Sequence, residues 1–218
     1  MTGSPAAARR RGCFFHGCLV GAVGLLLVLG GLLVALHYTW KTMLRFTDSQ
    51  PAELPAALLS RSEKNQLKRR CAAFEAALRE QRPAPALTLS ADEINALIAD
   101  DPRLQGFKGK VYVHLAGGQL QSQLSVPLEE AGWPQLKGRY LNGTATFRLS
   151  FQNGALAIRP QTIRVKGRPL PEIYMRAIRK WNLAAEAARQ PQVGALLQEL
   201  ADIRVRDSQL TLEPQRKP

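Results

Sequence analysis

Three pairs of adjacent carboxylates and one of the three histidines are the side chains of this sequence best suited to general acid–base chemistry. They are Asp92-Glu93, Asp100-Asp101, Glu129-Glu130 and His114. Adjacent residues project in different directions from a helix, so the two carboxylates of a pair do not converge on one substrate atom. Each pair is explained more simply as a helix cap, a helix end or a solvated turn. We therefore predict that the protein has no catalytic residues and is not an enzyme.

Metal ligands and reactive nucleophiles are equally sparse. Beyond residue 40 the sequence contains one cysteine, Cys71, and one histidine, His114, and neither has a neighbour at the spacing of a metal site. His114 lies in a predicted strand, on the side opposite to the apolar residues. The sequence contains no glycine-rich phosphate-binding loop. We expect no metal, no cofactor and no disulfide within this part of the chain.

The first 40 residues are typical of a membrane anchor. No charged residue occurs from Gly12 to Trp40, and three arginines precede this stretch. As a helix its apolar centre, residues 17–36, would rise about 30 Å, which matches the hydrocarbon thickness of a bilayer. The positive-inside bias predicts a cytoplasmic stub at 1–16, a single span at 17–40 of the inner (cytoplasmic) membrane, and an extracytoplasmic remainder. A cleaved signal peptide is the alternative, but the apolar centre is longer than the usual one and no small-x-small cleavage site follows it.

Small residues recur along the predicted span, and an aromatic residue ends it. The predicted anchor residues are Gly17, Gly21, Gly24, Gly31 and Trp40. A glycine stripe lets two helices approach closely, and Trp prefers the membrane interface. The span therefore also predicts a homo-oligomer formed through the membrane helix.

The charge balance of the remaining residues points to an anionic partner. The whole chain carries a formal net charge of +13. After residue 40 there are 27 basic and 17 acidic residues, a net charge of +10. A domain outside the cytoplasm rarely meets chromosomal DNA, so we expect no nucleic acid but rather the membrane, lipid head groups or an anionic envelope polymer. An arginine-rich genome is the alternative explanation of this excess.

Residues 41–85 are predicted to form a connector that contains one helix, between about Ser60 and Gln81. Apolar residues recur there at helical spacing, namely Leu67, Cys71, Phe74 and Leu78. Prolines flank the helix on both sides. This stripe predicts a helix that either lies against the following domain or pairs with a second copy of itself.

Three two-residue turns predict the register of hairpins in residues 86–218. Asn153-Gly154 places Phe151 opposite Leu156, and Gly117-Gly118 and Asp207-Ser208 form comparable hairpins. The strand from Tyr140 to Phe151 alternates apolar and polar residues, so one face of the sheet is expected to be wet. With a short strand at 87–89, the pattern predicts an α+β domain whose mostly antiparallel sheet has about seven strands.

Helices are predicted to cover one face of this sheet. Ser90 and Glu93 form a capping box, and further helices follow Pro171 and Pro191. An apolar groove between the helices and the sheet is the predicted binding site, and its expected ligand-binding residues are Leu149, Phe151, Trp181, Lys166 and Arg168. The two cations stand beside Gly167 and would meet an anionic head group. A tight strand-to-helix turn is the structural alternative for that segment.

The order of these parts resembles a known family. A stub, one membrane helix, a connector, and then the segment Leu87 to Ile98 followed by hairpins and the Gly167 to Pro171 turn resemble the uncharacterised single-pass bacterial envelope proteins of the YpmS type. Such proteins are more distantly similar to tubular lipid-binding folds, in which a curved sheet wraps a long helix around an acyl chain. The resemblance implies binding of a lipid or another amphiphile, and it supplies no functional residues.

Together these patterns predict a membrane-anchored extracytoplasmic domain that binds a lipid or another amphiphilic or anionic envelope component without chemistry. The alternative is a structural or assembly protein that acts through the membrane helix and the stripe of Leu67 and Leu78. A membrane-anchored hydrolase is the third hypothesis, and it would require carboxylates that converge in a cleft.

Overall fold

The computed structural model describes residues 28–34, 37–38 and 40–215 of the chain, which divides into two compact units at residues 45 and 46. In the first unit, the described residues from 28 to 45 are helical. No helix within the described residues has both the length and the apolar character needed to cross a membrane. The predicted anchor residues Gly17, Gly21 and Gly24 lie outside the described residues. Gly31 and Trp40 belong to the described helical residues.

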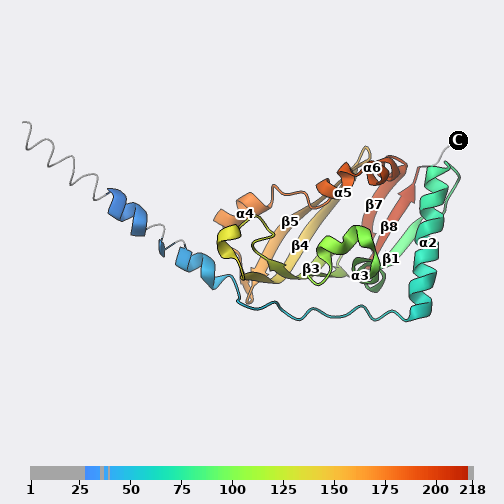
Figure 1. Ribbon diagram of the computed structural model, residues 1–218. Helices are drawn as coiled ribbons and strands as arrows, with labels where there is room; N and C mark the ends of the chain where they lie inside the picture. The colour runs from blue at the N-terminus through green and yellow to red at the C-terminus, as the bar shows by residue number, and fades with distance from the viewer. Residues whose placement is uncertain (1–27, 35–36, 39, 216–218) are drawn as a thin grey trace, which may run out of the picture. The chain divides into compact units, whose positions relative to one another are not determined.

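The second unit is an α+β domain with two antiparallel sheets (Figure 1). The larger sheet has the strand order β2-β3-β4-β5-β6 and the smaller has the order β1-β8-β7. Their bounds are β1 Leu87–Ser90, β2 Val111–Ala116, β3 Gln119–Pro127, β4 Tyr140–Gln152, β5 Ala155–Val165, β6 Arg168–Pro169, β7 Leu200–Arg206 and β8 Gln209–Pro214. The predicted α+β class is thus confirmed, but the single sheet of about seven strands is wrong. The last hairpin forms a separate sheet because its partner is β1.

All three predicted turns give the expected registers. Phe151 pairs with Leu156, Leu115 with Leu120, and Val205 with Leu210. The segment at Gly167 forms a fourth two-residue hairpin, because both Lys166 and Gly167 have positive φ angles and β6 returns along the end of β5. This hairpin precedes α4 (Glu172–Ile178), whereas the structural alternative given for this segment was a direct turn from strand to helix.

The four helices predicted for the second unit are present as α2, α3, α4 and α6, and a further short helix, α5, was not predicted. Their bounds are α2 Arg61–Arg79, α3 Ala91–Asp100, α4 Glu172–Ile178, α5 Ala185–Arg189, α6 Pro191–Gln198 and the 3₁₀ segment η1 Pro102–Phe107, with a shorter 3₁₀ turn η2 at Pro134–Leu136. The predicted capping box of Ser90 and Glu93 is present at α3, and Ser60 and Glu63 form a second one at α2. Figure 1 shows α2 beside the smaller sheet at one end of the domain and α4 at the opposite end.

Three adjacent clusters of buried apolar side chains make up the core. One joins β3, β4 and β5 to α4 through Phe147, Ile163 and Met175. The other two join both sheets to α2 and α6, and they bury three residues of the α2 stripe, Leu67, Phe74 and Leu78. Of the two alternatives for this stripe, the structure therefore selects packing against the domain.

The apolar face of the larger sheet is covered by α4 and α6. At its edge strand β2, a side chain forms hydrogen bonds with the outward-facing backbone groups. The buried amide of Asn95 on α3 donates to the Val113 carbonyl at 2.8 Å and accepts from the Val113 N–H at 2.7 Å. Asn95 thus imitates one residue of a further strand. This pairing satisfies backbone groups that an edge strand otherwise leaves open.

Candidate functional site

The second face of the larger sheet is polar, and its central side chains are exposed. Side chains alternate along a strand, so the residues between the core positions all project from this face. On β4 and β5 the exposed members are Thr144, Arg148, Ser150, Arg159, Thr162 and Arg164. On β2 and β3 the same face carries His114, Gln121 and Gln123. We call these residues the polar sheet face.

Strand pairing arranges the polar sheet face in rows across the sheet. One row contains His114, Gln121, Thr146 and Thr162, and the hydroxyls of the two threonines lie 2.6 Å apart. A second row contains Gln123, Thr144 and Arg164. A third pairs Arg148 directly with Arg159. Between the first and the third row, a bulge adds Gln161 to β5 and shifts the register between Thr146 and Phe147.

The charged side chains that the strands themselves place on this face are all positive. One carboxylate from the connector reaches the end of the face, where Asp48 accepts from the Asn142 amide at 3.2 Å. Strands β2 to β5 contain no Asp or Glu, and the sequence from residue 131 to residue 171 contains none either. Like charges directly opposite each other on neighbouring strands repel and destabilise the sheet. Arg148 and Arg159 occupy such a pair, and within the described part of the chain neither forms an ion pair. The face therefore concentrates cations that the protein itself does not neutralise.

Neighbouring polar groups hold two of the arginines without cancelling their charge. The Arg148 guanidinium donates to the side-chain amide oxygen of Gln161, with 2.8 Å between that oxygen and Nε of Arg148. The Arg164 guanidinium donates to the Gly167 carbonyl at 2.7 Å. Guanidinium groups held in this way keep donors free for phosphate or carboxylate oxygens, which they recognise bidentately.

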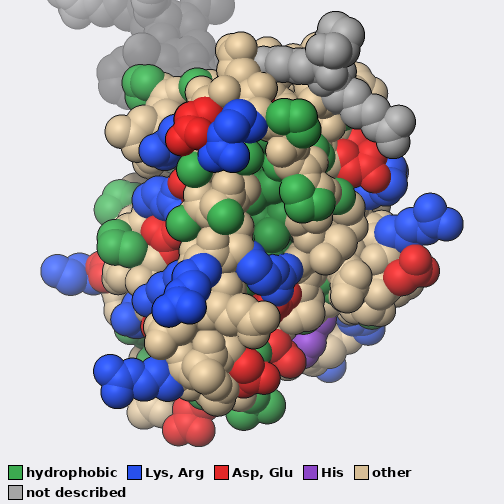
Figure 2. Space-filling view, turned by 90° about the vertical axis from the view of Figure 1, so that its right-hand side faces the viewer, with side chains coloured by type: hydrophobic (Ala, Val, Ile, Leu, Met, Phe, Trp, Pro, Cys, Tyr) green, Lys and Arg blue, Asp and Glu red, His purple; other side chains and the backbone are tan. Residues whose placement is uncertain are grey.

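Charges at the α2 end of the domain are arranged differently. Figure 2 views the molecule from this side and shows Lys and Arg side chains next to Asp and Glu side chains. Arg103 pairs with both Glu75 and Asp101, and Lys64 pairs with Asp100. The hydrogen bonds from Arg103 hold the pKa of the Asp101 carboxyl below its usual value. This end therefore neutralises most of its own charge and offers less to an anionic partner than the polar sheet face.

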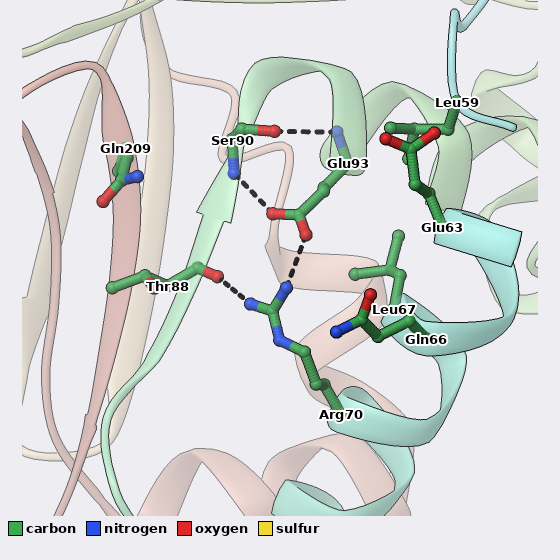
Figure 3. Close-up of a pocket in the computed structure, with 9 residues that line it drawn as sticks. All are labelled: Leu59, Glu63, Gln66, Leu67, Arg70, Thr88, Ser90, Glu93 and Gln209. Atoms are coloured by element: carbon green, nitrogen blue, oxygen red, sulfur yellow. Dashed lines mark hydrogen bonds and ion pairs between the residues drawn. The ribbon is translucent and has the colours of Figure 1, made fainter.

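A pocket of about 420 Å³ lies between α2, β1 and the start of α3 (Figure 3). Its lining is mostly polar and consists of Leu59, Glu63, Gln66, Leu67, Arg70, Thr88, Ser90, Glu93 and Gln209. Arg70 extends from α2 into the pocket. There its guanidinium donates to Glu93 at 2.6 Å and to the Thr88 carbonyl at 2.5 Å. The pocket thus contains an ion pair that joins α2 to the first turn of α3.

The polar groups of this pocket are largely occupied by one another. Glu93 also accepts from the Ser90 N–H at 2.9 Å, and the Ser90 hydroxyl accepts from the Glu93 N–H at 3.2 Å. Glu63 accepts from the Ser60 N–H in the same way, and hydrogen bonding to Ser60 lowers the pKa of the Glu63 carboxyl. A lowered pKa suits a structural carboxylate rather than a proton donor at neutral pH. This arrangement stabilises helix starts, and it lacks a nucleophile activated by a base.

The other reactive side chains of the domain do not form a site in the described part of the chain. Partial burial raises the pKa of the Cys71 thiol, which makes it a weaker nucleophile at neutral pH. His114 lies on the polar sheet face, 3.3 Å from the amide of Gln123, and it is exposed. No group of three His, Cys, Asp or Glu side chains within the described residues could hold a metal ion.

The predicted ligand-binding residues are distributed over different environments. Leu149 and Phe151 are partly buried and pack against the cluster of Phe74 and Leu197. Lys166 forms an ion pair with Asp48 at 2.8 Å. Arg168 and Trp181 are exposed. The structure therefore does not gather the five residues around one groove.

The alternating pattern of β4 predicted its wet face, but the sequence analysis did not place Arg159 and Arg164 on that face. A signal for Arg159 was available, because the Asn153-Gly154 register that pairs Phe151 with Leu156 also pairs Arg148 with Arg159. No such signal existed for Arg164, since the bulge at Gln161 changes the register beyond Thr146. The absence of acidic residues from 131–171 was a second usable signal.

No family model, curated protein sequence or solved structure matched this chain. The resemblance to envelope proteins of the YpmS type stays a prediction.

Proposed function

We propose that this chain is a membrane-anchored, extracytoplasmic and non-enzymatic binding protein whose ligand is an anionic polymer of the cell envelope. The polar sheet face is the proposed binding surface, with Arg148, Arg159 and Arg164 as the cations that contact the ligand. The anchor rests on the charge-free residues 12–40 of the sequence.

The observation that carries this proposal is the opposition of Arg148 and Arg159 on a strand pair without carboxylates. Directly opposed like charges cost a fraction of a kcal/mol, roughly 0.2–1 kcal/mol, relative to a neutral pair. An anionic group bound between the two guanidinium groups removes this repulsion and adds charge-assisted hydrogen bonds. The arrangement is thus unfavourable for the empty domain and favourable for a complex with an anion.

The shape of the surface favours a polymer over a small anion. Arg148 and Arg159 lie on adjacent strands, which are about 5 Å apart. Arg164 lies five residues further along β5 than Arg159, a separation of roughly 16 Å in an extended strand. A chain with regularly spaced phosphate or carboxylate groups contacts all three cations at once. The threonines and glutamines between them add hydrogen bonds to sugar or backbone oxygens.

An enclosed acyl chain is supported less well. Leu149 and Phe151, the apolar residues predicted to contact it, already pack within a core cluster. The pocket beside α2 has two apolar lining residues, Leu59 and Leu67, among nine. Burial of a hydrocarbon chain requires a mostly apolar lining. We therefore favour the anionic part of the predicted ligand class over the lipid part.

Binding of two anionic polymers to the full chain in an uncharged detergent tests the proposal. Inorganic polyphosphate and polygalacturonate supply phosphate and carboxylate groups. In the Arg148→Gln/Arg159→Gln variant we expect an affinity loss of about tenfold or more, because two charge-assisted contacts disappear. Binding by the unchanged protein should also weaken with salt.

The matched control is Arg61→Gln/Arg69→Gln, which removes the same charge from exposed positions on α2. We expect its affinity to change less than about twofold, because net charge alone acts weakly at a distance in salt. Equal losses of affinity in the two variants would show that only the net charge of the protein matters, which would contradict a site at Arg148 and Arg159. A protein that binds neither polymer would also overturn the proposal.

A further inference from the structure

The outer side of α4 combines exposed apolar and basic side chains. Its buried residues are Met175 and Ile178, which belong to the core cluster beneath the helix. Ile173 and Arg176 are exposed on the helix itself, and Lys180, also exposed, lies in the turn that follows it. The side chain of Ile173 is 66 % exposed, and Trp181, in the turn after the helix, is 42 % exposed. We call Ile173, Arg176, Lys180 and Trp181 the α4 surface.

The charge of the α4 surface is positive. The nearest described carboxylate in the sequence, Glu172, forms an ion pair with Arg179, which also donates to the Gln161 carbonyl at 3.2 Å. Among the described residues, Arg176 and Lys180 form no ion pair. An apolar side chain, a tryptophan and two free cations on one surface are typical of segments that lie in the interface of an anionic membrane.

The entry point of the chain into the domain lies at the same core cluster. Phe46, the first residue of the second unit, packs against the cluster that contains Met175 and Ile178. Asp48 pairs with Tyr140 by backbone hydrogen bonds and with Lys166 by an ion pair. Figure 1 shows α4 at the end of the domain where this segment enters.

This position limits the distance between α4 and a membrane that holds residues 17–40. The six residues from Trp40 to Phe46 span at most about 20 Å when fully extended. If residues 17–40 span a membrane, this short length of chain keeps Phe46, and with it the core cluster beneath α4, within reach of the lipid surface.

We infer that the α4 surface docks onto the head groups of an anionic lipid leaflet. Arg176 and Lys180 contact the lipid phosphates, and Ile173 and Trp181 enter the interface beside them. This inference rests on the membrane anchor of the proposed function but not on the polar sheet face. Docking would hold the domain in one orientation and keep the sheet arginines available to a polymer.

The fluorescence of Trp181 tests this inference in the full chain. Trp40→Phe and Trp133→Phe leave Trp181 as the remaining one of the three tryptophans. The protein is reconstituted into vesicles of phosphatidylcholine with or without phosphatidylglycerol. We expect quenching by bromine-labelled lipid, and protection from aqueous acrylamide by about threefold, in the vesicles with phosphatidylglycerol. Uncharged detergent and pure phosphatidylcholine should give neither effect.

Substitution of the two cations shows whether protection of Trp181 depends on contacts between the α4 surface and lipid phosphates. Arg176→Gln/Lys180→Gln should abolish the dependence on phosphatidylglycerol, and Arg61→Gln/Lys68→Gln at the α2 end should preserve it. A Trp181 that acrylamide reaches equally in all vesicles would overturn the inference. Protection already present in detergent would also overturn it, because a second copy of the chain would then cover the surface.

The same samples separate this result from failure of the anchor. Protein that does not remain with the vesicles in high salt would contradict the predicted membrane span itself. Protein that remains with them while Trp181 stays in water would contradict the docking surface alone.

Discussion

Among the described glycines, Gly143 leaves the least room for a side chain. It lies near the start of β4, and a Cβ atom added to it would stand 2.1 Å from the carbonyl oxygen of Arg164 on β5. Glycine at this position thus permits a close approach of two backbones rather than a special turn. The contact links the packing of the sheet to the placement of Arg164 on the polar sheet face.

We expect Gly143→Ala to lower the free energy of unfolding by about 2 kcal/mol, because the backbones of β4 and β5 must separate. Urea unfolding of the full chain in detergent, followed by circular dichroism, measures this change. Gly106→Ala is the control, since no atom lies within 4 Å of the Cβ position there. A change below about 0.5 kcal/mol at Gly143 would show that the strands separate easily.

At the scale of elements, α3 is held to the edge of the larger sheet by one amide. Asn95→Ala removes both hydrogen bonds to Val113 and leaves a buried N–H and a buried carbonyl without partners. We expect a loss of roughly 2–4 kcal/mol in unfolding free energy, since each such group costs about 1–3 kcal/mol. Gln119→Ala, at an exposed position on β3, should change it by less than about 0.5 kcal/mol in the same urea titration. Equal effects of the two substitutions would contradict this role for Asn95.

Turns and helix starts were predictable from the sequence, because residues close together in the chain determine their geometry. The two-residue turns at Asn153-Gly154 and Gly117-Gly118 need positive φ angles and fix the register of their hairpins, and Ser90 with Glu93 fixes the start of α3. The choice of partner for the last hairpin was not predictable, because β1 and β8 are paired across more than 100 residues of chain. A local pattern specifies a strand but not its distant neighbour.

The arrangement of the polar sheet face, the proposed binding surface, was predictable only in part, for the same physical reason. The turn register places Arg148 opposite Arg159, but the bulge at Gln161 and the return of β6 determine where Arg164 and Arg168 lie. Leu149 and Phe151, predicted to line a groove, pack in a cluster with residues of the second sheet, which the sequence patterns did not separate from the first. Long-range packing thus decided which apolar residues remained available to a ligand.

At the scale of the whole domain, charges are balanced at one end and left unbalanced on one face. Ion pairs such as Arg103 with Glu75 and Asp101 neutralise the α2 end, whereas the polar sheet face has no carboxylate among its strands. The arginines of the polar sheet face repel one another, and an anionic ligand bound between them would remove this repulsion. Stability of the empty domain and affinity for the ligand should therefore change in opposite directions when one sheet arginine is neutralised.

Arg159→Gln provides this test, because it removes the repulsion with Arg148 but also one ligand contact. Without ligand, we expect the unfolding free energy to rise by roughly 0.2–1 kcal/mol, as the opposed like charges are relieved. With polyphosphate, the unchanged protein should gain stability through binding to the folded state, and the variant should gain less. Thermal unfolding of the full chain with and without polyphosphate measures both effects, and Arg69→Gln on α2 should alter neither. If Arg159→Gln instead destabilises the empty domain, the guanidinium has a structural partner, and the unfavourable charge pair no longer argues for an anionic ligand.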